Sequence, residues 1–136
     1  MIAILCIDLR FGLMFGGRRQ SRDRLVLEDI QNLCGQKTLR MNEYSGRLFL
    51  QYGFPCPNVS EHFLDEAGPG DFCFVEDAPL LNVRDKLEKL ILYQWNRTYP
   101  ADLYFNPKLI DGWTRTETKE FSGSSHQTIT REVYER

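Results

Sequence analysis

The sequence predicts an α/β protein: a three-layer sandwich on a mostly parallel sheet, with an antiparallel hairpin at the C-terminus. Two continuously apolar runs, Ile2 to Ile7 and Phe72 to Val75, are typical of strands that are buried on both faces. Helix-spaced apolar residues lie between these runs, and residues 113–134 look like two strands joined by a turn. A length of 136 residues suits one domain, 1–136.

The first half of the chain is predicted to alternate strands and helices. After the strand at 2–7, residues 9–20 are predicted to form a loop, and Ser21 is the expected N-cap of the following helix. Gly35 is expected to end that helix. Its apolar face comprises Val26, Ile30, Leu33 and Cys34.

The middle of the chain carries three further predicted elements. Leu39 and Met41 alternate as in a short strand, and a short helix is expected over 43–51. Asn58 and Glu61 have the spacing of a capping box. The helix that they predict has apolar residues at Val59, Phe63 and Ala67 and stops at Gly68.

The second half is predicted to consist mainly of strands. Pro79 suits the first turn of a short helix that runs through Leu87. Strands are then expected at 90–93 and 103–105, and the closing hairpin turns near Gly123-Ser124-Ser125.

Composition and charge exclude several classes of protein. There are 17 basic and 19 acidic residues and a net charge of -2, which argues against a nucleic-acid-coating protein. The longest apolar run is too short to cross a bilayer, and no signal peptide is evident. The four cysteines form no CxxC pair, and the two histidines lie far apart in sequence, so we expect no metal site and a cytoplasmic location.

Both ends of the chain show an order of motifs found in one family. An apolar strand, Asp8, a glycine-containing loop and a helix opened by Asp23 come first. Near the C-terminus, an apolar strand is followed by the stretch 101–105, by Asp111-Gly112-Trp113 and by a hairpin. This order resembles the dihydrofolate reductase family. The resemblance implies that Asp23 is the acid that contacts the pterin ring, and that Tyr93 replaces the threonine that supports this acid.

The cofactor half of the chain departs from that family. Residues 42–45 read Asn-Glu-Tyr-Ser where the family has a phosphate-binding Gly-Arg-x-Thr motif. Glu76-Asp77 stands where the family has a Gly-Gly pair beside the pyrophosphate, and two carboxylates there repel an anion. The segment 50–70 is too short for the part that holds the adenosine. We therefore expect no conventional NADPH site, and no cofactor is predicted.

A cluster of basic residues is the most distinctive local feature. Arg18, Arg19, Arg22 and Arg24 surround the start of the predicted helix. Arginine there indicates a site for an anionic ligand. The alternative is a solvated basic loop that is paired with acids elsewhere. Asp23 within this cluster is the best candidate for ligand contact or catalysis, and its alternative role is to stabilise the helix start.

Two other groups of residues have alternative interpretations. Tyr93, Trp95, Tyr99 and Tyr104 either line a ligand pocket or fill a core or dimer interface. Gly123-Ser124-Ser125-His126 is interpreted as a turn, because a Ser–His–acid hydrolase normally presents its serine in a GxSxG elbow that this chain lacks.

The sequence leaves three functional hypotheses and does not settle whether the protein is an enzyme. The first is a non-reductase that binds a small anionic or heterocyclic ligand, with Asp23 on a ring nitrogen and Arg18, Arg19 or Arg22 on an anion. The second is a divergent pterin- or pyrimidine-type reductase that uses NAD(P)H. The third is a homodimeric interaction domain without a small ligand.

Overall fold

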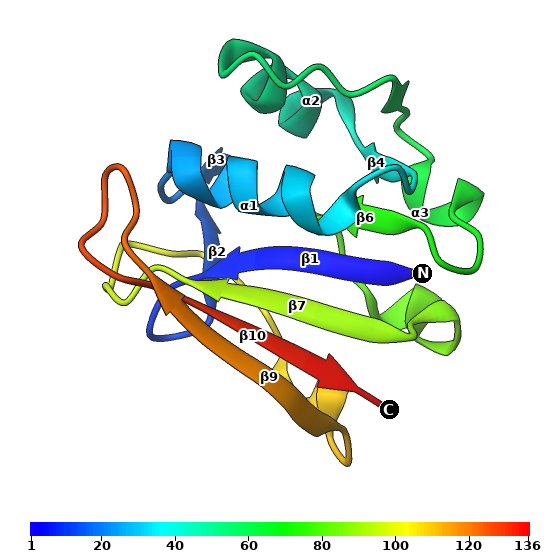
Figure 1. Cartoon of the computed structure of the whole chain (residues 1–136). Coiled ribbons are helices and arrows are strands. Elements are labelled where there is room, and N and C mark those ends of the chain that lie inside the picture. The colour runs from blue at the N-terminus through cyan, green and yellow to red at the C-terminus, as the bar shows by residue number, and fades with distance from the viewer.

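A seven-stranded sheet forms the centre of the protein (Figure 1), whose computed structural model describes residues 1–136. The strand order is β5-β4-β6-β1-β7-β10-β9. All strands from β5 to β7 run parallel, whereas β10 is antiparallel to both of its neighbours, which confirms the predicted sheet and hairpin. The strands are β1 (Ile2–Ile7), β4 (Leu39–Met41), β5 (Asn58–Val59), β6 (Phe72–Phe74), β7 (Lys89–Gln94), β9 (Thr114–Phe121) and β10 (Ile129–Glu135).

Two α-helices, α1 (Arg24–Cys34) and α2 (Glu43–Gln51), form the layer on one side of the sheet. The predicted face of α1 is correct, since Val26, Ile30 and Cys34 are buried in the core on that side. Gly35 ends the helix with a φ of 56°, a backbone angle that favours glycine.

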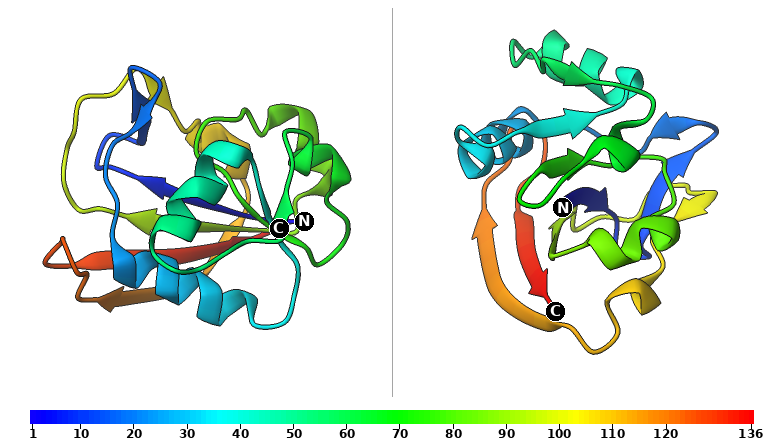
Figure 2. Two further views of the ribbon diagram at one scale, coloured as in Figure 1. Left: turned by 90° about the horizontal axis from the view of Figure 1, so that it is seen from above. Right: turned by 90° about the vertical axis from the view of Figure 1, so that its right-hand side faces the viewer.

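The opposite side of the sheet carries shorter elements: α3 (Phe63–Glu66) and the 3₁₀ helices η1 (Leu81–Lys86) and η2 (Pro107–Ile110). Their apolar side chains pack with β1 into a second core. In the right-hand view of Figure 2, α1 and this second group lie on opposite sides of the sheet. Helical elements thus cover both faces, as the three-layer prediction requires.

The predicted loop at residues 9–20 contains two strands, which corrects the sequence analysis. β2 (Gly12–Phe15) and β3 (Arg18–Arg19) form a hairpin through Gly16 and Gly17, which both have positive φ. β8 (Leu103–Tyr104) pairs with the other side of β2 and completes a small sheet. These strands are too short to show a repeating apolar pattern in sequence.

Two predicted element boundaries were also wrong. The N-cap of α1 is Asp23, two residues after Ser21, because the Asp23 side chain accepts a hydrogen bond from the Leu25 N–H. The predicted helix after Asn58 begins only at Phe63, since Asn58 and the next residue form β5. The Glu61 carboxylate instead accepts from the Glu43 N–H at the start of α2.

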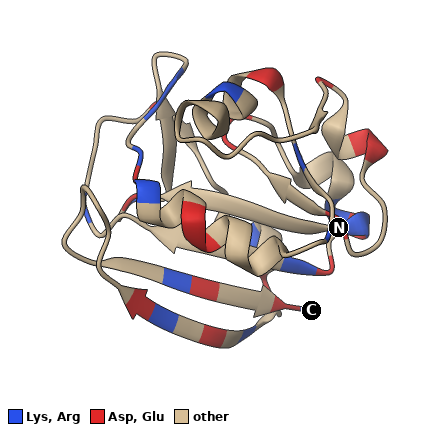
Figure 3. Ribbon diagram, turned by 45° about the horizontal axis from the view of Figure 1, so that its top comes forward, with Lys and Arg blue, Asp and Glu red and all other residues tan.

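The outer edge of the sheet is strongly polar. β9 is exposed along Thr114 to Glu120, and both acidic and basic residues occur along β9 and β10 (Figure 3). Arg115 on β9 forms an ion pair with Glu132 on β10 at 3.0 Å. None of the helices is both long and apolar enough to cross a bilayer.

Candidate functional site

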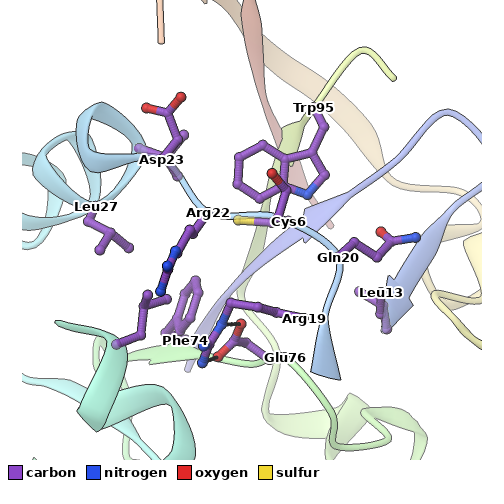
Figure 4. A pocket seen from close by; sticks show the side chains of 13 residues that line it. Cys6, Leu13, Arg19, Gln20, Arg22, Asp23, Leu27, Phe74, Glu76 and Trp95 are labelled. Atoms are coloured by element: carbon purple, nitrogen blue, oxygen red, sulfur yellow. Dashed lines mark hydrogen bonds and ion pairs between the residues drawn. The ribbon is translucent and has the colours of Figure 1, made fainter. Parts of the chain in front are cut away.

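Asp23 joins the start of α1 to the tip of the β9–β10 hairpin. Its Oδ1 accepts hydrogen bonds from the Leu25 N–H and from the N–H and hydroxyl of Ser124, at 2.9 to 3.0 Å. Its Oδ2 accepts from the Ser125 N–H at 2.8 Å and lies 3.0 Å from His126 Nδ1. The side chain is fully buried, and its carboxylate points away from the neighbouring cleft (Figure 4). Asp23 therefore contacts the hairpin and presents no free oxygen to that cleft.

The ionisation of Asp23 follows from these contacts. Burial alone raises its pKa, but hydrogen bonds from Ser124, His126 and Ser125 outweigh burial and hold the pKa well below its ordinary value. An ionised carboxylate only accepts hydrogen bonds, so His126 Nδ1 must carry the proton that it shares with Asp23.

His126 is a functional candidate that the sequence pattern indicated only as part of a turn. Its ring is buried and stacks on Trp95, with 4.6 Å between the ring centroids. Its Nε2 lies 3.0 Å from both the Ser21 hydroxyl and the Tyr99 hydroxyl. The hairpin thus brings His126 between Asp23 and Ser21, residues more than 100 positions away in sequence, and no local motif indicates this.

Gly123 allows the hairpin to approach Asp23 closely. A Cβ atom at this position would overlap the Asp23 carboxylate and lie 2.9 Å from the His126 carbonyl oxygen. Gly123→Ala is therefore expected to lower the free energy of unfolding by about 1 to 3 kcal/mol, the usual cost of overpacking. Urea denaturation measures the change. Gly68→Ala is the control, because its new Cβ meets only Asp71 Oδ2 at 3.9 Å, and equal losses in the two variants would contradict the prediction.

Arg19 and Glu76 close the cleft between β3 and the end of β6. The guanidinium makes two hydrogen bonds to the Glu76 carboxylate, at 2.8 and 2.9 Å, and lies over the Tyr44 ring at 4.2 Å. Ser45 donates a further hydrogen bond to Glu76 at 2.8 Å. Glu76 raises the pKa of Arg19, although burial opposes this shift and is the largest single influence. The bridge lies beside Phe74 in the lower part of Figure 4.

The other three arginines of the predicted cluster diverge. Arg22 donates to the side-chain oxygen of Gln51 at 3.1 Å, and Arg24 donates to the Tyr52 carbonyl at 3.4 Å. Both contacts lie at the C-terminal end of α2, where basic groups are favourable. Arg18 is exposed and makes no ion pair. Three arginines at the start of α1 and on β3 therefore have protein partners.

Tyr93 lies apart from the cleft, in the core beneath α1. It is fully buried and its hydroxyl donates to Asp29 at 2.6 Å. Burial, with the nearby charge of Asp29 adding to it, raises the pKa of Tyr93 above its ordinary value. Arg131 donates to the same carboxylate at 2.7 Å, so Tyr93 is part of a buried polar network between α1, β7 and β10.

Two cavities flank the β2 strand. The first is the cleft beside Arg19, and it holds only about 20 Å³, close to the space of one water. The second holds about 520 Å³ on the opposite face of the sheet, between η1 and the segment from β8 to η2. Leu13 contributes to both walls. The second cavity is lined largely by apolar side chains, among them Leu5, Leu80, Leu81, Leu103, Phe105 and Leu109.

No pattern in the sequence indicated the larger cavity. η1 and η2 are single short 3₁₀ segments, so a wide apolar surface stays uncovered between them. The exposed apolar residues Leu81, Leu103 and Tyr104 mark its rim, and they are spread over two distant parts of the chain. Elsewhere, no three His, Cys, Asp or Glu side chains lie close enough to hold a metal ion.

Comparisons with known proteins identify the fold. No protein-family model and no curated protein sequence matches this chain. Among solved structures, the chain is similar to a dihydrofolate reductase from Enterococcus faecalis, whose structure holds NADP(H) and RAB-propyl. The match has a TM-score of 0.68 and 14% sequence identity, and it covers 99% of this chain and 95% of that one. The chain therefore has a dihydrofolate-reductase-like fold in a highly divergent sequence.

Proposed function

We propose that this dihydrofolate-reductase-like domain is a small-molecule-binding protein that does not use NADPH, and that its ligand is an amphipathic organic acid. The observation that supports this most strongly is the 520 Å³ apolar cavity between η1 and the β8–η2 segment. Pockets for small organic ligands are typically about 300 to 1,000 Å³ and combine apolar walls with a few polar groups.

The charged side chains around this cavity favour an anionic ligand. Arg84 and Lys108 line it from η1 and η2, both are exposed, and neither takes part in an ion pair. No acidic side chain lines the cavity. A ligand with a hydrocarbon or aromatic body can fill the apolar part while its carboxylate pairs with these two cations.

The cleft on the other face supports the absence of an NADPH site. The Arg19–Glu76 bridge forms part of its wall and leaves room for about one water. Glu61 and Asn42 already accept hydrogen bonds from the first N–H groups of α2. A helix N-terminus occupied by a carboxylate of its own chain repels a cofactor phosphate. Asp77, which accepts a hydrogen bond from the Asn42 side chain, adds a further negative charge near the start of α2.

An anion at the arginine cluster remains the second candidate. Its best support is Arg22, which lines the small cavity and is paired only with the neutral amide of Gln51. Arg18 is also unpaired, whereas Arg19 is neutralised by Glu76. The small cavity would have to widen to admit a ring.

We place the protein in the cytoplasm, a proposal supported by its four free cysteines.

Decanoate is expected to stabilise the protein more than decanol does, and NADPH is expected to leave the melting temperature unchanged. Ligand at 100 times its Kd adds about 2.7 kcal/mol to the free energy of unfolding. Arg84→Gln and Lys108→Gln should each weaken decanoate binding about fivefold, or roughly 1 kcal/mol. Calorimetric titration measures the affinities, and Lys119→Gln on exposed β9 is the control.

Each hypothesis predicts a different ligand response. A thermal shift with NADPH would support a reductase, and a shift with folates or phosphate that Arg22→Gln removes would support the arginine cluster. A melting temperature that rises with protein concentration, without any ligand response, would support a homodimer. Equal affinity for decanoate in wild type and Arg84→Gln–Lys108→Gln would overturn the proposed anion contact.

A further inference from the structure

Ser21, His126 and Asp23 stand in series across the junction between α1 and the hairpin. Ser21 Oγ is 3.0 Å from His126 Nε2, and His126 Nδ1 is 3.0 Å from Asp23 Oδ2. We infer that this arrangement is an acyl-transfer site: Ser21 is the nucleophile, His126 the general base, and Asp23 positions the imidazole. The substrate class is a small activated carboxylic ester. This activity lies outside the proposed ligand cavity.

The surroundings hold the imidazole in the form that a general base needs. Asp23 is ionised and accepts a hydrogen bond from Nδ1–H, so that in the neutral imidazole the Nε2 lone pair is directed toward the hydroxyl groups of Ser21 and Tyr99. The Trp95 ring stacks on the imidazole at an interplanar angle of 21° and fixes its plane. Ser124 and Ser125 hold the Asp23 carboxylate in place through their backbone N–H groups.

Ser21 is reachable from the cleft. It is only half-buried and lines the small cavity, together with Arg22. The cavity beside Ser21 holds only about 20 Å³, close to one water, so the ester must approach Ser21 from its solvent-exposed side and its acyl group must be small. The Arg22 side chain lines the same cavity and places on its wall a cation that is hydrogen-bonded only to the neutral Gln51 side chain.

Tyr99 modulates the site. Its hydroxyl also lies 3.0 Å from Nε2, and one lone pair cannot fully accept two hydrogen bonds. Tyr99 therefore competes with Ser21 for the base. Tyr99→Phe removes the competitor and leaves Nε2 to Ser21 alone. A purely structural cluster would not become more reactive on this change.

The reaction balances with water as the only co-reactant. Ser21 Oγ forms a bond to the ester carbonyl carbon while its proton passes to His126 Nε2. The bond to the leaving alkoxide or phenoxide then breaks, and this oxygen takes the proton from Nε2. Water repeats the two steps on the acyl-serine, with His126 again accepting and returning a proton. The products are a carboxylic acid and free Ser21.

Fluorophosphonate labelling of the whole protein tests this inference. Peptide mass mapping is expected to find the label on Ser21, and Ser21→Ala should remove it. His126→Gln should slow labelling about 100-fold, the usual effect of losing a general base. Tyr99→Phe should accelerate it. Ser122→Ala, an exposed serine in the same hairpin, is the control and should label like wild type. Hydrolysis of p-nitrophenyl acetate should follow the same order.

Two results would overturn the inference. One is the absence of label on Ser21 in both wild type and Tyr99→Phe, with melting curves that show both proteins folded. The other is labelling of Ser21 at the same rate in His126→Gln as in wild type. Ser21 lines the small cavity, whereas Arg84 and Lys108 line the large one. Ser21→Ala should therefore still bind decanoate, and each proposal can fail without the other.

Discussion

Asp23→Ala is expected to lower the free energy of unfolding by about 3 to 5 kcal/mol, the largest effect of any single substitution proposed for this chain. The change removes a fully buried carboxylate that accepts hydrogen bonds from α1 and from the hairpin. It leaves His126 and the N–H groups of Ser124 and Ser125 without their acceptor, and a buried unsatisfied donor is costly. Denaturant unfolding measures the loss.

The effect of Asp23→Ala on the free energy of unfolding should depend on pH. The folded-state pKa of Asp23 is depressed below its unfolded value of about 3.9, so its contribution is fully present above that pH and is lost as the pH falls through the folded-state value. Wild type should lose this contribution below about pH 4, whereas Asp23→Ala should lack it throughout. Asp85→Ala, an exposed acid, is the control. A loss below 1 kcal/mol at pH 7 would contradict the structural role of Asp23.

Arg19→Met is expected to cost about 2 to 3 kcal/mol, because it leaves the Glu76 carboxylate unpaired in a largely buried position. The two side chains are only 18% and 10% exposed. The substitution also removes the contact with Tyr44. The free energy of unfolding should recover in part when Glu76 is also replaced by glutamine, and a double-mutant cycle measures this coupling.

An exposed ion pair provides the comparison for Arg19. Arg115 and Glu132 pair at 3.0 Å on the hairpin, with side chains 56% and 21% exposed. Arg115→Met should cost less than 1 kcal/mol, as solvent-exposed pairs usually do. Similar losses for Arg19→Met and Arg115→Met would show that the cleft bridge adds no special stability.

Local sequence patterns predicted those parts of the fold in which a segment's own residues determine its secondary structure. The run Ile2 to Ile7 is a central strand because its side chains are apolar on both faces, and Gly35 ends α1 because that position requires a positive φ. β3 was missed because two residues, Arg18 and Arg19, are too few to show a period, although Gly16-Gly17 is a turn signal.

The site was only partly predictable, because its partners are far apart in sequence. Asp23 could be selected from its place at a helix start, but its contact with His126 spans 103 positions and depends on the hairpin that β9 and β10 form. The arginines were visible as a cluster. The sequence did not indicate their different partners, because neighbouring residues in a chain can contact different elements. Arg19 pairs with Glu76, whereas Arg22 contacts the end of α2.

The charged outer strand has a consequence for self-association. β9 is the last strand of the sheet, so one side of its backbone is an unpaired edge onto which another chain could add a strand. Strand addition would desolvate its exposed charged side chains, which makes the addition unfavourable; these are Arg115, Glu117, Lys119 and Glu120. The opposite edge, β5, offers only two residues. Both edges of the seven-stranded sheet are therefore poorly suited to edge-to-edge strand addition.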